Sequence, residues 1–487
     1  MIRSLWLFAG VLFFSVVLTF GVGCTNPPNN ETNQESTTDA SETTKEAPKS
    51  DASESTPEVK PEPTLEPKPE PAQEPTPEPT TDASEPTPDA SEPTPENTPE
   101  PTQETTPDTP PAKAAKVVVF SNDYVKSASA LTVADVANGK IDGKLDGVKL
   151  AAADSVVKYS ADGSLIYVLS RYNNAGKEDT VTVHKASDFS VVSKSNLGKK
   201  ANPYDIVDVN GKVYISLYGR DYLLHGTLGK LASFTQVDLS SLAEKSSLKC
   251  SKDDDCKGSF GGGTKKCDTK AGVCQSDGLP EASKMLLYKG RLYVLIQGLD
   301  RNQGFKPVKS CVAEIDTSTN KLQTCLPLKG TNPTAIVPTA SADEWVIVLN
   351  GTAGKDDDSG LQMLTPGRKD KVGRDWLITK KELGAASMPY GGELVYTAKD
   401  KAYIVINDKS FKQLLVKFDP TSQTPSPSVL IQATSLAGLA LLPNGWVVVG
   451  DKGSKSLRVF DSSTDTEDTA KKLKVTDMNP AAILLKR

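Results

Sequence analysis

From about residue 115 onward, the chain repeats one alternation of apolar and polar positions. A short apolar strand leads to a tight polar turn, a more strongly apolar strand follows, and a charged loop ends the unit. The pattern starts six times, at residues 154, 202, 282, 332, 387 and 435. Turns such as Asn-Gly at 210–211 suit two-residue hairpins. The second strands, for example residues 212–218 and 291–297, are rich in β-branched and aromatic residues, which favour strands.

A seventh unit is divided between the two ends of this repeating region. Residues 479–487 read as a first strand without a second, and residues 115–124 read as a second strand without a first. A circular propeller closes in this way, because a blade built from both ends leaves no exposed sheet edge. The sequence therefore predicts an all-β fold, a seven-bladed β-propeller over residues 114–487. A pair of β-sandwiches is the alternative, but it leaves the complementary end strands unexplained.

A second pattern follows the first two strands of each unit. Residues 311–325 and 456–464 read as an apolar strand, an Asp, a Ser/Thr turn and further strand residues. This phrase resembles the YVTN-type and lactonase-like seven-bladed propellers, which carry a similar turn in each blade. The resemblance implies the architecture, and that architecture serves many functions. No catalytic motif of the lactonase relatives matches here, so no catalytic residue is carried over.

The N-terminal segment has the pattern of an export signal. Residues 1–23 contain one charged side chain, Arg3, and an apolar run followed by small residues. The tetrapeptide Gly-Val-Gly-Cys that ends at Cys24 resembles a bacterial lipobox, which implies a cleaved signal peptide and a lipidated Cys24. An uncleaved transmembrane anchor is the alternative. Both place the rest of the chain in the cell envelope, on the periplasmic or the outer surface, and by the same resemblance Thr25 favours the outer membrane.

Composition then separates a spacer from the repeating region. Residues 24–113 hold 21 of the 34 prolines, 21 acidic residues, five lysines and no aromatic residue, a net charge of −16. Such a stretch cannot bury enough apolar surface to offset chain entropy, so we expect a disordered linker. Extended at ~3.1 Å per residue, it would reach roughly 280 Å. Residues 114–487 carry 50 basic and 41 acidic residues, a net charge of +9.

The six cysteines after Cys24 predict three disulfides in an exported protein. Cys311 and Cys325 flank one hairpin turn and are expected to pair. The other four lie in a small insertion at 249–279 and leave three connectivities open; they are Cys250, Cys256, Cys267 and Cys274. A zinc site is the alternative, but the C-x2-C spacing is missing. Together with the acidic linker, this insertion makes the chain similar to exported lipoproteins of myxobacteria.

Candidate chemistry is sparse. The chain has two histidines, His184 and His225, and neither the G-x-S-x-G, the P-loop nor the H-E-x-x-H pattern. The sequence predicts no cofactor. The three adjacent carboxylates at 253–255 could bind Ca²⁺, but no EF-hand spacing follows them and a solvated loop explains them equally.

Charged and polar residues follow the second strands, where propeller loops gather on one face. The candidate ligand-binding residues of this rim are Asp123, Arg171, Arg220 (followed by Asp221), Asp300, Arg301, Asn350, Asp408 and Asp451. The competing interpretation is that they only solvate loops. We expect a monomeric binding or scaffolding module for a protein, peptide or glycan, without nucleic-acid binding because no basic stripe occurs. The alternative is a lactonase-like or metal-assisted hydrolase that uses the rim carboxylates.

Overall fold

The computed structural model describes residues 116–141, 148–150, 152–172, 176–228, 234–257, 266–341, 343–367, 372–388, 393–422, 426–475 and 477–485. The expected signal segment, the lipidation site Cys24 and the spacer therefore lie outside the described residues. No helix in the described ranges combines the length and apolar composition that crossing a membrane requires.

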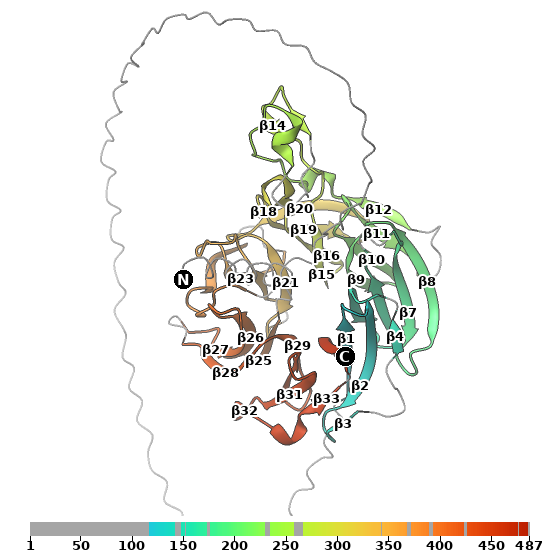
Figure 1. Ribbon diagram of the computed structural model, residues 1–487, viewed down its shortest axis with the longest axis vertical. Helices are drawn as coiled ribbons and strands as arrows, with labels where there is room; N and C mark the ends of the chain where they lie inside the picture. The colour runs from blue at the N-terminus through green and yellow to red at the C-terminus, as the bar shows by residue number, and fades with distance from the viewer. Residues whose placement is uncertain are drawn as a thin grey trace, which may run out of the picture. The chain divides into compact units, whose positions relative to one another are not determined.

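The described residues form a seven-bladed β-propeller, as the repeat predicts (Figure 1). Each blade is an antiparallel sheet whose strands follow one another outward from the centre of the ring. From the innermost strand outward, blade A consists of β34 (Asn479–Leu485), β1 (Lys116–Asp123) and β2 (Ala128–Asp135), with β3 (Lys140–Ile141) and β4 (Val148–Leu150) both on β2. Blade B consists of β5 (Ser155–Tyr159), β6 (Leu165–Ser170), β7 (Asp179–Lys185) and β8 (Val191–Gly198). Blade C consists of β9 (Pro203–Val209), β10 (Lys212–Leu217), β11 (Tyr222–Gly226) and β12 (Thr235–Asp238).

Blades D to G continue the same order. Blade D consists of β15 (Ala282–Tyr288), β16 (Arg291–Ile296), β19 (Cys311–Asp316) and β20 (Lys321–Pro327), and blade E of β21 (Pro333–Pro338), β22 (Trp345–Leu349), β23 (Gly360–Leu364) and β24 (Val372–Thr379). Blade F consists of β25 (Leu394–Ala398), β26 (Lys401–Asn407), β27 (Gln413–Phe418) and β28 (Ser428–Ala433). Blade G consists of β29 (Leu436–Leu441), β30 (Trp446–Asp451) and β31 (Ser456–Asp461), with β32 (Thr466–Glu467) and β33 (Leu473–Lys474) both on β31.

The ring closes through the two end strands. Strand β34 pairs antiparallel with β1, with Val119 opposite Ile483 and Val118 opposite Leu484. Strand β34 also contacts the innermost strands of both neighbouring blades, β29 of blade G and β5 of blade B. Blade A is thus built from both ends of the described chain, which confirms the predicted division of the seventh unit.

Seven clusters of buried apolar residues, counted over the described ranges, hold the blades together. Each cluster lies between two neighbouring blades. Strand β10 shows how the sequence does this: Tyr214 points toward blade D, while Val213 and Ile215 point toward blade B. Because successive side chains of a strand point to opposite faces, a strand buried on both faces must be apolar throughout. This is why the second strands stand out in the sequence.

Tyrosine hydroxyls tie several blades to the next one. Tyr167 Oη of blade B donates to Asp208 of blade C, and Tyr403 Oη of blade F donates to Asp465 of blade G. Asp465 also lies 2.8 Å from Lys417 Nζ and 3.3 Å from Lys401 Nζ. These polar bonds join neighbouring blades beside the apolar clusters that contain Tyr167 and Tyr403.

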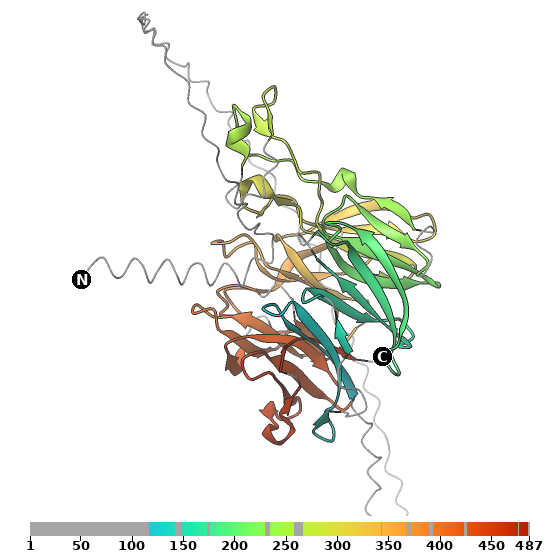
Figure 2. The ribbon, with the colours of Figure 1, turned by 45° about the vertical axis from the view of Figure 1, so that its right-hand side comes forward.

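The insertion between blades C and D stands apart from the blade sheets (Figure 2). It contains a short hairpin, β13 (Cys267–Asp268) with β14 (Val273–Cys274), and the 3₁₀ helix η3 (Asp253–Cys256). Further short elements are η2 (Ser240–Leu242) before the insertion, η5 (Thr469–Lys471) in blade G, and β17 (Leu299–Asp300), η4 (Arg301–Gln303) and β18 (Lys306–Pro307) in the loop that joins β16 to β19.

Candidate functional site

All rim residues predicted from the sequence lie at the ends of second strands or in the loops that follow, but most of their side chains bond locally. Asp123 Oδ1 accepts hydrogen bonds from the amides of Val125 and Lys126, at 3.0 and 3.1 Å. Asp408 Oδ1 accepts from the amides of Ser410 and Lys412, both at 2.8 Å. A short carboxylate at the end of a strand caps its own turn in this way.

Three further rim residues also bond within the propeller, through the side chain or the main chain. Asp451 accepts from the amide of Ser454 at 3.1 Å. Arg220 donates to main-chain carbonyl oxygens, among them that of Lys199 at 2.7 Å, and so holds the connection that enters its own blade. The main-chain amide of Asn350 donates to the carbonyl oxygen of Asn332 at 3.0 Å.

The rim carboxylates do not gather into a metal-binding group. Over the described residues, only one set of three potential metal-ligand side chains has its ligand atoms within 4.8 Å of one another, and that set is Cys250, Cys256 and Cys274. All three sulfur atoms belong to disulfides. The geometry therefore supplies no convergence of Asp123, Asp300, Asp408 and Asp451 on one ion.

Two predicted rim residues turn inward. Asp300 is fully buried, and its Oδ1 accepts from the amide of Asn302 at 3.0 Å, which caps η4. Arg301 Nε lies 2.7 Å from Asp277 Oδ2 and 3.3 Å from Glu281 Oε1. These side chains serve the base of the insertion instead of the open rim.

Arg171 is the predicted rim residue whose guanidinium lies beside an innermost strand of the next blade. Its guanidinium forms an ion pair with Asp154 and lies 5.7 Å from the ring centre of Tyr204, on the innermost strand of blade C. Its Nε is enclosed and makes no hydrogen bond to any described residue. Arg171 therefore marks the place where polar side chains of several blades meet.

We call this group the axial cluster; its members are Asp154, Lys158, Arg171, Tyr204, Asp205, Lys284, Glu393 and Lys452. Lys284 Nζ, from blade D, lies 5.7 Å from the same Tyr204 ring, so two cations approach one aromatic ring. Tyr204 also stacks on Tyr218, with ring centres 5.6 Å apart. Lys158 Nζ of blade B donates to Asp205 Oδ1 of blade C at 2.9 Å. Burial works to raise the pKa of Asp205, but the ammonium groups of Lys158 and Lys284 outweigh it and hold that pKa below its usual value.

Glu393 and Lys452 bring blades F and G into the axial cluster. Burial raises the pKa of Glu393 to about 7, against a hydrogen bond from the Gly438 amide and the charges of Lys452 and Lys284. Glu393 Oε2 is enclosed and bonds to no described residue. Burial likewise lowers the pKa of Lys452, which the Glu393 carboxylate opposes. The cluster thus holds a carboxyl group that titrates near neutrality and two enclosed polar atoms, Arg171 Nε and Glu393 Oε2, without hydrogen bonds.

Most members of this cluster were not predicted from the sequence. Asp205, Lys284 and Glu393 each precede the first-strand residue that pairs with the middle of the second strand: Ile206 with Ile215, Met285 with Val294, and Leu394 with Ile404. In the other four blades, B, E, G and A, the matching positions are Val156, Ala335, Gly438 and Ala482. Charged residues at one repeat position that elsewhere holds an apolar residue or glycine are therefore the signal that an alignment of the seven units would have revealed.

The six predicted disulfide cysteines form three bonds. Cys311 pairs with Cys325, as the hairpin predicts. The register places them diagonally, since Cys311 lies opposite Pro327 and Ala313 lies opposite Cys325. In the insertion, Cys250 pairs with Cys267 and Cys256 with Cys274, which resolves the connectivity that the sequence left open.

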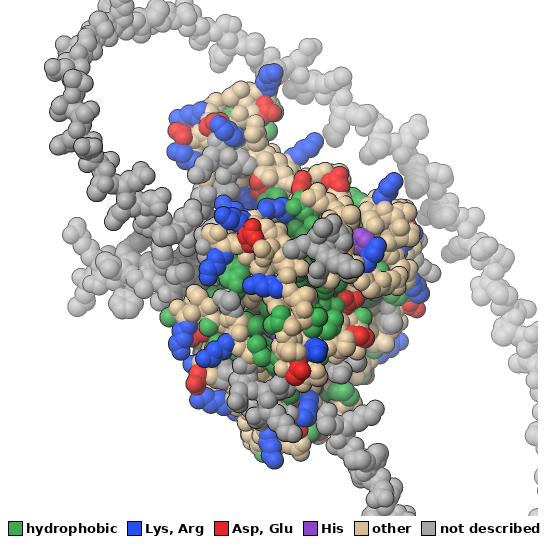
Figure 3. Space-filling view, turned by 90° about the vertical axis from the view of Figure 1, so that its right-hand side faces the viewer, with side chains coloured by type: hydrophobic (Ala, Val, Ile, Leu, Met, Phe, Trp, Pro, Cys, Tyr) green, Lys and Arg blue, Asp and Glu red, His purple; other side chains and the backbone are tan. Residues whose placement is uncertain are grey.

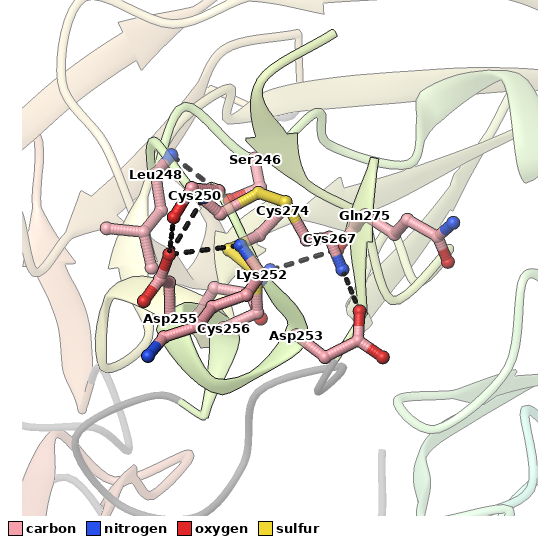
Figure 4. The surroundings of a disulfide bond; sticks show 12 residues. Ser246, Leu248, Cys250, Lys252, Asp253, Asp255, Cys256, Cys267, Cys274 and Gln275 are labelled. Carbon is pink, nitrogen blue, oxygen red and sulfur yellow. Dashed lines mark hydrogen bonds between the residues drawn. A yellow bond between two sulfur atoms is a disulfide. The ribbon is translucent and has the colours of Figure 1, made fainter. Parts of the chain in front are cut away.

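The acidic run 253–255 serves the insertion itself (Figure 4). Asp253 Oδ1 accepts from the Cys267 amide at 2.9 Å, and Asp255 Oδ2 accepts from the Ser251 amide at 2.8 Å. Asp254 lies 3.0 Å from Lys257 Nζ. The three carboxylates therefore point to three different partners. Elsewhere on the surface, Lys and Arg side chains are spread among acidic and neutral ones on the face shown in Figure 3.

Comparison with known proteins adds little. No protein-family model matches the chain, and no curated protein matches it. Similar solved structures include a candidate 6-phosphogluconolactonase from Bacteroides fragilis, with 11% identity over 76% of this chain and 98% of that chain, and a TM-score of 0.48. Apo AztD from Citrobacter koseri has 13% identity over 76% and 97%, with a TM-score of 0.39. A protein from Lactobacillus plantarum has 12% identity over 76% and 98%, with a TM-score of 0.44. At these values the likeness assigns no function to the chain.

Proposed function

We propose that this chain is a lipid-anchored binding module of the cell envelope, whose propeller holds an anionic peptide or glycan at the axial cluster. The observation that carries the binding role is the meeting of charged side chains from blades B, C, D, F and G, two of which, Arg171 and Lys284, approach the ring of Tyr204. Lys158, Arg171, Lys284 and Lys452 face three carboxyl groups, those of Asp154, Asp205 and Glu393. The cluster therefore has a net charge of +1, or +2 when Glu393 is protonated, which favours an anion.

The chemistry of the cluster suits such a ligand. Arg171 Nε is a buried donor without a partner among the described residues, and a carboxylate or sulfate oxygen would satisfy it. The stacked rings of Tyr204 and Tyr218 offer an apolar face to a sugar ring or a peptide side chain. The anchored location is supported by the sequence alone, through the signal pattern, Cys24 and the acidic spacer.

Binding is tested by an array of anionic and neutral glycans and acidic peptides, followed by calorimetric titration of the ligands found. We expect Lys284→Ala and Lys452→Ala each to weaken binding about tenfold or more, equivalent to about 1.4 kcal/mol. Lys472→Ala, at an exposed lysine, is the matched control and should bind as the natural chain does. Binding that is unaffected by both axial substitutions would place the ligand elsewhere.

Anchoring is tested separately from binding. Cells that express the full chain and are fed a labelled fatty acid should incorporate the label, and Cys24→Ser should abolish the incorporation. Unchanged labelling of Cys24→Ser would contradict the lipid anchor without touching the ligand site.

A hydrolase is the second candidate, and Glu393 is the observation that favours it. A carboxyl group with a pKa near 7 suits general-base catalysis at neutral pH, and Lys284 and Lys452 could stabilise a developing oxyanion. Lactone hydrolysis by the natural chain, lost about a hundredfold or more in Glu393→Gln, would establish this alternative. Ligand binding without turnover of lactones would leave the binding module as the function.

A further inference from the structure

The cysteine-rich insertion is attached to blade D through a buried polar joint. The joint consists of residues 244–247 and 275–281, which lead into and out of the insertion, and residues 299–303 after β16. Three side chains of the last segment bond to the other two: Asp300 Oδ2 accepts from Ser246 Oγ (2.8 Å), Gln303 Nε2 donates to Ser247 Oγ (2.8 Å), and Asn302 Nδ2 donates to the carbonyl oxygen of Gln275 (3.0 Å). The seating of the insertion on the propeller therefore depends on these contacts.

Four carboxyl groups share this joint with one guanidinium group. Glu244, Glu281 and Asp300 are 3%, 0% and 0% exposed, and Asp277 lies beside them partly buried. Arg301 contacts Asp277 and Glu281. If all four carboxyl groups were ionised, the joint would hold a net charge of −3 away from water. Uncompensated buried charge of this kind costs several kcal/mol, so burial favours the neutral, protonated form of a carboxyl group.

Glu244 has the least compensation of the four. Its Oε1 accepts from Ser276 Oγ at 3.1 Å, and its Oε2 is enclosed with no hydrogen bond to any described residue. Burial, and then the charges of Asp277 and Asp300, raise the pKa of Glu244 to about 7.

Two other carboxyl groups of the joint, those of Glu281 and Asp277, have pKa values shifted in the same direction. Burial and then Asp277 raise the pKa of Glu281 well above its usual value, although Arg301 opposes them. Burial also raises the pKa of Asp277. Tyr218 also acts on the joint, through its charge interaction with Arg301.

We propose that the joint is a pH-responsive attachment, which holds the insertion firmly on blade D in a mildly acidic medium and loosens it as the medium becomes neutral and alkaline. A carboxyl group whose pKa is raised by folding contributes stability that is complete below its unfolded pKa of 4.5 and is lost as the pH rises through about 7. For Glu244 alone, this linkage makes opening of the joint about 30-fold more favourable at about pH 8.5 than at about pH 5.5. The attachment does not depend on what the axial cluster binds.

Hydrogen–deuterium exchange of the full chain, corrected for the intrinsic exchange rate at each pH, measures this opening. Peptides that cover residues 244–247, 275–281 and 299–303 should lose about 30-fold of their protection between about pH 5.5 and pH 8.5. Peptides from blade E, such as residues 345–364, should keep theirs. A change of less than about threefold in the joint would overturn the proposal.

Two substitutions identify the groups responsible. Glu244→Gln removes the ionisable group with little change in shape, so it should flatten the pH dependence of hydrogen exchange in the joint. Glu281→Gln removes a second buried carboxyl group of the joint and should have the same effect. Glu178→Gln, at an exposed glutamate in blade B, is the matched control and should retain the full dependence. If neither joint variant reduces the pH dependence, the carboxyl groups of the joint are not its cause. Should one variant fail to fold, the other still decides the question.

Discussion

The closing strand of the ring lies against a glycine of blade G, and this contact yields a sharp prediction. Gly438 lies at the bulge of β29 with a φ of +67°. A Cβ at this position would lie 2.7 Å from Ile483 N and 2.9 Å from the carbonyl carbon of Ala482, both in β34. Because these are main-chain atoms, no change of rotamer can relieve the contact. We predict that Gly438→Ala forces β34 away from β29 and destabilises the closed ring.

The cost has two parts that a control can separate. An alanine in the left-handed region costs about 1–2 kcal/mol, and forcing atoms into a packed interface adds about 1–3 kcal/mol. Gly211 has a φ of +75°, and no atom lies within 4 Å of the place that an added methyl group would occupy, so Gly211→Ala carries the first cost only. We therefore expect Gly438→Ala to be about 1–3 kcal/mol less stable than Gly211→Ala.

Urea unfolding of the full chain, followed by tryptophan fluorescence, measures this difference. Trp446 begins β30, the strand that pairs with β29, so it reports on the affected blade. Gly438→Ala should unfold at a clearly lower urea concentration than Gly211→Ala, and both should unfold below the natural chain. Equal unfolding midpoints for the two variants would refute the reasoning, because β34 would then move aside without cost.

Four further predictions follow from the fold and its titratable groups. Tyr403→Phe removes the hydroxyl that bonds to Asp465 in the next blade and should lower the free energy of unfolding in urea by about 1–2 kcal/mol. Tyr124 is 53% exposed, so Tyr124→Phe should leave that free energy unchanged. Equal effects of the two substitutions would contradict the role of the inter-blade bond. Glu393→Gln should stabilise the chain by up to about 3 kcal/mol near pH 8 and have no effect near pH 4. Folding raises the pKa of Glu393 from 4.5 to about 7, so the stabilising contribution of this carboxyl group is lost as the pH rises through about 7. A gain in stability that is the same at both pH values would argue against this titration. Removing the Cys311–Cys325 bond by a double alanine substitution should lower the stability of the propeller by about 3 kcal/mol, and unchanged thermal unfolding would show that the hairpin needs no bond. Removing the Cys256–Cys274 bond should speed hydrogen exchange in the insertion and leave the unfolding of the blades unchanged. If the blades also lost stability, the insertion would be shown to support them.

The strand pattern was predictable because each second strand is buried on both faces. Strands β10 and β16 were found at 212–217 and 291–296, almost as expected from the runs at 212–218 and 291–297. The first strand of blade F shows the limit of this reasoning. The unit starts at residue 387, but β25 begins at Leu394, and Ser387 makes only an isolated bridge with Asn407.

The sequence by itself determined the seven-bladed plan, the division of blade A between the two chain ends and the Cys311–Cys325 pair, because each of these rests on local periodicity or on complementary strands. Only the tertiary structure decided which charged side chains meet. Asp205 bonds to the amide of Met285, 80 positions away, and Asp300 bonds to Ser246, 54 positions away. Ring closure sets such distances, whereas a charge at a strand end looks the same in the sequence whether it caps its own turn, turns inward or faces the axis.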